Sequence, residues 1–199
     1  MAAGTFDAGI YVYPWDVVGD PAAAERVAGL GVGHATVAAF YHATRALTPR
    51  HPGHRVVVAE RSAAYLPVGP AWSHLLPEPS FAASFHATPR PRVSLANTGV
   101  DMATLPAGTT GVVVNCWNGS AAPVEASVEA MGEVVPGRGH RVQVYAGLLG
   151  IRGMGGDPEG LARVIAEVRA AGAAGVRIYH AGLAGADDLT AIGKALADA

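Results

Sequence analysis

The chain has 199 residues, of which half are hydrophobic and 15% are charged, and its formal net charge is −2. This length favours one well-buried domain that covers residues 1–199. The charge balance argues against a nucleic-acid-binding surface, which needs clustered positive charge. Cys116 is the only cysteine, which excludes an intramolecular disulfide. The first residues lack the features of a signal peptide, and no apolar run reaches the roughly 20 residues of a membrane helix. We therefore expect a cytoplasmic protein with neither a membrane nor a nucleic acid as partner.

Seven short apolar runs predict buried parallel strands, because the runs are continuous rather than alternating. In chain order they cover residues 9–14, 35–41, 55–60, 82–87, 111–116, 141–148 and 175–180.

Two helices are predicted between these strands, each introduced by Gly-Asp-Pro. Asp20 is expected to cap a helix that starts at Pro21, and Asp157 a helix over residues 158–171. Both lead through a glycine turn into a strand that ends in Tyr-His. Two similar units of this kind are typical of repeated βα modules.

The predicted fold class is therefore α/β, a parallel (β/α) TIM-barrel-like fold. Seven strands are one fewer than a closed barrel requires, so the barrel is expected to be incomplete. The stretch 66–80 carries four prolines and no helical period, which predicts an irregular connection.

Several phrases of the sequence resemble one known group of proteins. They are YVYPWD, AAFYHATRALTPRHPGHRVV, SFHATPRP, VVVNCW and VRIYHAGL. They resemble alanine-rich actinobacterial proteins with glycoside-hydrolase-like (β/α)8 barrels, over most of the N-terminal third and most of the region after Phe81. In that group, further βα units with acidic strand ends are expected in the middle, where this chain has residues 66–80. The resemblance implies a shortened barrel that lacks central carboxylates and has open sheet edges.

In a barrel of this kind the functional groups lie at the carboxyl ends of the strands. Aromatic rings pack on the apolar face of a sugar, and polar side chains bind its hydroxyls. The candidate substrate-binding residues at these ends are Trp15, Tyr41, His42, His86, Asn115, Trp117, Asn118, Tyr145, Tyr179 and His180.

Two carboxylates are candidates for catalysis. Glycoside hydrolysis requires a pair of them on either side of the scissile bond, and Asp16 and Glu60 are the acidic residues closest to predicted strand ends. Asp16 is equally well explained as a turn or helix-cap carboxylate, and Glu60 is better explained as half of a surface ion pair with Arg61.

Three histidines at strand ends, His42, His86 and His180, raise the alternative of a metal-dependent hydrolase or isomerase. Their spacing matches no metal-binding motif, so no metal and no cofactor are expected.

The leading hypothesis is a glycoside-hydrolase-like protein that binds, or binds and hydrolyses, a carbohydrate. The alternative is a shortened, non-catalytic barrel that acts in binding or assembly, with two copies pairing through open sheet edges.

Overall fold

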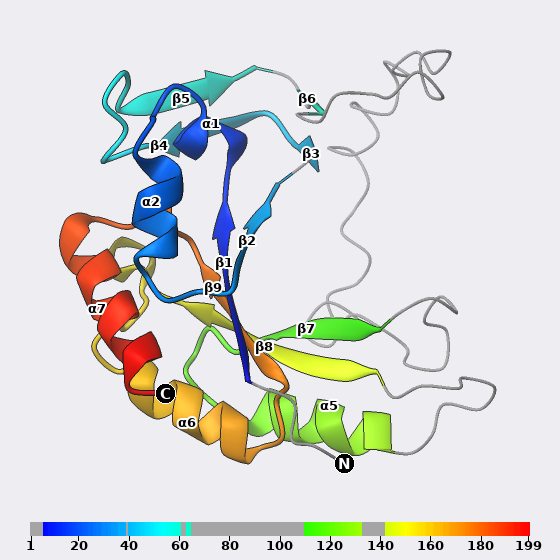
Figure 1. The fold of residues 1–199 in the computed structure, drawn as a ribbon. Helices are drawn as coiled ribbons and strands as arrows, with labels where there is room; N and C mark the ends of the chain where they lie inside the picture. The colour runs from blue at the N-terminus through cyan, green and yellow to red at the C-terminus, as the bar shows by residue number, and fades with distance from the viewer. Residues whose placement is uncertain (1–5, 39, 61–62, 65–109, 133–141) are drawn as a thin grey trace.

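The computed structural model describes residues 6–38, 40–60, 63–64, 110–132 and 142–199. Five parallel strands form its main sheet, in the spatial order β2-β1-β9-β8-β7 (Figure 1). Their bounds are β1 Asp7–Val12, β2 His34–Val37, β7 Gly111–Asn115, β8 Gln143–Leu149 and β9 Gly175–Tyr179. The predicted α/β class is confirmed. The described strands form an open sheet, with β2 and β7 at its two edges.

The first and last strands of the sheet are neighbours. Ile10 of β1 lies opposite Ile178 of β9, and on its other side opposite Ala35 of β2. Leu148 of β8 also lies opposite Ile178. The first and last strands that the structure describes therefore lie side by side within the sheet.

Helices connect these strands. Between β1 and β2 lie α1 (Pro14–Val17) and α2 (Ala23–Ala28), and α5 (Ala122–Gly132) joins β7 to β8. The short 3-10 helix η3 (Arg152–Met154) and α6 (Leu161–Ala170) join β8 to β9, and α7 (Ala186–Ala197) ends the chain. Figure 1 shows α5, α6 and α7 together on one side of the sheet.

The core lies between the sheet and these helices. It contains alternate residues of the strands, including Ile10, Leu148 and Ile178. In α6, Leu161, Val164, Ile165 and Val168 are all buried, which is the stripe that residues three and four apart form on a helix.

Both predicted helices begin later than expected. The Asp157 carboxylate accepts the N–H of Gly160, the residue before α6, so it caps a turn that precedes the helix. Asp20 likewise accepts the N–H of Ala22, and α2 starts one residue further on. The Asp-Pro pairs stabilise the entry turns, and the helices follow them.

The opposite face of the sheet is polar and aromatic. One row across the five strands reads His34, Gly9, Arg177, Gly147 and Asn115. A Cβ on Gly9 would lie 2.3 Å from His34 Nε2, and one on Gly147 would lie 2.9 Å from Asn115 Oδ1. The two glycines thus leave room for the polar side chains beside them.

Two further strand pairs are antiparallel. β4 (Thr44–Leu47) pairs with β5 (Val56–Ala59), and β3 (Phe40–Tyr41) pairs with β6 (Ala63–Ala64). The prediction of a buried parallel strand over 55–60 was therefore wrong. Val56 and Val58 of β5 are exposed, so this apolar run forms half of a surface hairpin.

The other strand predictions have mixed outcomes. The runs 111–116 and 175–180 each contain a strand of the parallel sheet, and the runs 9–14 and 141–148 each cover most of one. The run 35–41 contains most of β2 and then, separately, β3. The run 82–87 and the connection 66–80 lie outside the described residues. No helix in the described ranges is both long and apolar enough to cross a bilayer.

Candidate functional site

The carboxyl ends of the parallel strands form one edge of the sheet, which we call the rim. We define it by the residues that end these strands or lie within two positions after them, together with the first turn of α1, β3 and His42. Its described members among the predicted site residues are Trp15, Asp16, Tyr41, His42, Asn115, Trp117, Tyr179 and His180.

Three tyrosine hydroxyls meet at the rim, and we call them the tyrosine cluster. The hydroxyl of Tyr13 lies 2.6 Å from that of Tyr179 and 2.8 Å from that of Tyr41. Burial, together with these hydrogen bonds, raises the pKa of Tyr13, and burial raises the pKa of Tyr179. These two hydroxyls therefore stay neutral over the physiological pH range.

Aromatic rings pack around this cluster. The ring of Tyr13 stacks on Trp15 at 4.8 Å between centroids and on His180 at 4.0 Å. The ring of Trp117 lies 5.5 Å from that of Tyr179, and 46% of Trp117 is exposed. Trp117 thus offers an accessible aromatic surface beside the tyrosine hydroxyls.

Asp16 is buried next to Tyr13, in the first turn of α1. Its Oδ2 accepts the backbone N–H of Tyr13 at 2.7 Å, so the helix-cap role considered for Asp16 is observed. Burial raises the pKa of Asp16 to about 6, although the Tyr13 N–H, Arg50 and His51 all favour the ionised form. Its Oδ1 has no hydrogen-bond partner among the described residues.

His180 faces Asp16 from the end of β9, and only 1% of it is exposed. Its Nδ1 accepts the N–H of Gly182 at 3.1 Å, which assigns the ring proton to Nε2. Nδ1 also lies 3.6 Å from Asp16 Oδ2, where two acceptors oppose each other. Burial lowers the pKa of His180 to about 3, so its imidazole is neutral at pH 7.

Gly182 and Arg50 complete this buried group. A Cβ on Gly182 would lie 1.8 Å from the Asp16 carboxylate, so only glycine admits the carboxylate at that place. The Arg50 guanidinium donates to the carbonyl oxygens of Ala181 and Ala184, which ties the turn after β4 to the loop after β9.

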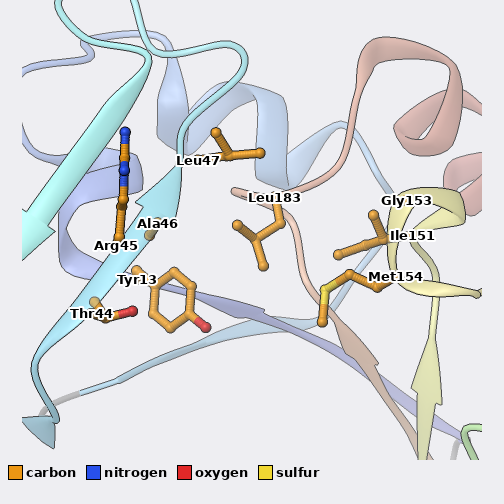
Figure 2. Close-up of a pocket in the computed structure, with 9 residues that line it drawn as sticks. All are labelled: Tyr13, Thr44, Arg45, Ala46, Leu47, Ile151, Gly153, Met154 and Leu183. Carbon is orange, nitrogen blue, oxygen red and sulfur yellow. The ribbon is translucent and has the colours of Figure 1, made fainter.

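A pocket of about 290 Å³ opens beside the cluster, between β4, η3 and the loop after β9 (Figure 2). Tyr13, Leu183 and Met154 point toward one another across the pocket, whereas the side chain of Arg45 extends away from Leu183 and Met154. The described residues that line it are Tyr13, Thr44, Arg45, Ala46, Leu47, Ile151, Gly153, Met154 and Leu183. Tyr13 therefore belongs both to this pocket and to the tyrosine cluster.

Other predicted site residues lie apart from the cluster. Glu60 is exposed just after β5, on the surface hairpin. Tyr145 lies within β8 rather than at its end, under the guanidinium of Arg177 at 4.0 Å. Asn118 Oδ1 accepts the N–H of Ser120 in the turn before α5.

The metal hypothesis finds no site in the described part of the chain, where no three His, Cys, Asp or Glu side chains gather closely enough to hold an ion. His42 is exposed and stacks on Tyr41, with its Nδ1 2.6 Å from the Ala43 carbonyl oxygen. His86 lies outside the described residues.

The sequence reasoning missed three contributors to the site. Tyr13 could have been identified, because it directly follows a strand and precedes a proline. Arg50 and Gly182 carried no local signal, since their roles depend on contacts with distant parts of the chain.

Comparison with known proteins returns no relative. No family model matches the chain, and no curated protein or solved structure matches it significantly.

Proposed function

We propose that the protein binds a carbohydrate at the rim of an incomplete (β/α) barrel. The observation that carries this proposal is the exposed Trp117 ring, which lies 5.5 Å from the ring of Tyr179. The Tyr179 hydroxyl is hydrogen-bonded to that of Tyr13, which is in turn hydrogen-bonded to that of Tyr41. An aromatic surface next to neutral hydroxyls suits a ligand with apolar ring faces and many hydroxyl groups.

The tyrosine cluster suits hydroxyl ligands for a second reason. Each hydroxyl is both a donor and an acceptor, and the direction of a hydroxyl chain reverses by rotation of its hydrogens. Such a chain accommodates a ligand hydroxyl in either role. Because the pKa of Tyr13 and of Tyr179 is raised, neither brings a charge to the rim.

The barrel part of the proposal is supported by the strand order. In a closed parallel barrel the last strand of the chain lies beside the first. Here the last strand, β9, lies between β1 and β8, as it would in a barrel. The spatial order β2-β1-β9-β8-β7 is part of the cyclic order of a barrel, which is open between β2 and β7.

The geometry favours binding over hydrolysis. Hydrolysis requires two carboxylates that flank the scissile bond. Asp16 is buried and its Oδ2 holds the Tyr13 backbone, while Glu60 lies on the surface hairpin. In this proposal Asp16 positions Tyr13 rather than contacting the ligand.

The test is thermal unfolding of the full chain with a panel of neutral monosaccharides and their methyl glycosides. A ligand that binds only the folded state raises the midpoint. We expect Trp117→Ala to weaken binding of the active sugar about tenfold, and Val58→Ala, on the exposed face of β5, to leave it unchanged. If no sugar shifts the midpoint, or if Trp117→Ala binds as the parent does, the proposal is wrong.

A further inference from the structure

We propose that the ligand is amphipathic, a glycoside whose apolar aglycone occupies the pocket between Tyr13, Met154 and Leu183. This inference rests on the proposed carbohydrate binding at the rim and adds the class of ligand.

The pocket lining indicates an apolar, uncharged occupant. Apolar side chains from three separate segments line it: Ala46 and Leu47 from β4, Ile151 and Met154 around η3, and Leu183 after β9. Among the described lining residues only Arg45 is charged, and its side chain extends away from Met154 and Leu183 (Figure 2). A charged group placed against these apolar side chains would lose part of its hydration.

The volume indicates the size of the occupant. The pocket measures about 290 Å³, and an apolar cavity of about 150 Å³ already binds benzene. A phenyl ring therefore fits, with room for the atoms that link it to a sugar. The thioether of Met154 adds a favourable contact with such a ring.

Tyr13 lies between the pocket and the tyrosine cluster, the two parts of the proposed site. Its ring lines the pocket, and its hydroxyl contacts Tyr41 and Tyr179 at the rim. Only 4% of Tyr13 is exposed. One molecule would therefore place an apolar group against the Tyr13 ring in the pocket and a polar ring near Tyr41 and Tyr179, which are partly exposed.

The experiment measures the dissociation constants of methyl and phenyl glycosides of glucose, galactose, mannose and xylose, and of phenol alone, by calorimetry. We expect a phenyl glycoside to bind about tenfold more tightly than the methyl glycoside of the same sugar. Met154→Lys should abolish that difference and leave the methyl glycoside unaffected. Val18→Lys, on an exposed valine outside the pocket, should change neither.

Each outcome separates this inference from the proposed function. Equal affinity for phenyl and methyl glycosides overturns the aglycone pocket and leaves sugar binding intact. Binding of phenol without any glycoside overturns sugar binding, and absence of all binding overturns both. If Met154→Lys does not fold, as judged by circular dichroism, Met154→Ala replaces it, and an unchanged preference for the phenyl glycoside in that variant contradicts the inference.

Discussion

The two faces of the parallel sheet differ in what they bury. On the face covered by α5, α6 and α7, Ile10, Val176 and Ile178 are completely buried. On the other face the same strands carry Arg177 and Tyr179, which remain partly exposed. Parallel sheets are usually covered on both faces and read as continuous apolar runs. The contrast shows that one face packs against the helices to form the core, while the other face carries polar and aromatic side chains that remain partly exposed.

The largest expected effect is on the helix-covered face. Ile178→Ala removes buried methyl groups at the centre of the core and should lower the free energy of unfolding by about 3 kcal/mol. Val113→Ala, at a β7 position that is 45% exposed, should change it by less than about 0.5 kcal/mol. Urea unfolding of both variants measures the difference. Equal losses would contradict the distinction between the faces.

A second prediction concerns the charge buried at the rim. The folded-state pKa of Asp16 is raised from 3.8 to about 6, so its unfavourable contribution to stability develops as the pH rises from 3.8 through 6. The pKa of His180 is lowered from 6.5 to about 3, so stability is lost as the pH falls below 6.5 toward 3. Between pH 3.8 and about pH 6 the contributions of Asp16 and His180 change in opposite directions. Together they should therefore change the unfolding free energy of the parent little over this range.

Asp16→Asn removes one of the opposing contributions. From about pH 7.5 to about pH 4.5, the variant should lose about 2 kcal/mol more of its unfolding free energy than the parent loses. Urea unfolding at both pH values measures this difference. Parallel pH profiles for variant and parent would show that the carboxyl group is not perturbed by burial.

The smallest effect is expected at Gly9, which lies beside His34 on the polar face of the sheet. Gly9→Ala places a methyl group against the His34 imidazole and should cost about 1 kcal/mol of unfolding free energy. Because the clash is with that side chain, Gly9→Ala should cost less in a His34→Ala background. A double-mutant cycle by thermal unfolding gives the coupling. Strict additivity of the two changes would show that Gly9 does not make room for His34.

The elements best predicted from the sequence are those whose apolar residues face the core. The strands near residues 9–14 and 175–180 and the stripe of α6 follow directly from their hydrophobic pattern. The prediction for the run 55–60 was wrong because three consecutive valines resemble a buried parallel strand. The Pro-Gly pair at residues 52–53 before it is a typical hairpin signal, and it joins β4 to β5.

The candidate site was predictable only in part. Trp117, Tyr179 and His180 follow from the rule that functional groups gather at the carboxyl ends of parallel strands. The burial of Asp16 was not predictable, because it depends on the missing side chain of Gly182. The pocket was not predictable either, since Leu47, Met154 and Leu183 come together only through the tertiary fold.

The most direct test of carbohydrate binding at the rim is a nuclear magnetic resonance titration of the indole N–H signals. The chain has three tryptophans, so three such signals are expected, and Trp117→Phe assigns the one at the rim. With a sugar that raises the unfolding midpoint, the Trp117 signal should show the largest saturable shift. A Trp117 signal that stays unchanged while the sugar binds would place the ligand elsewhere and contradict the account.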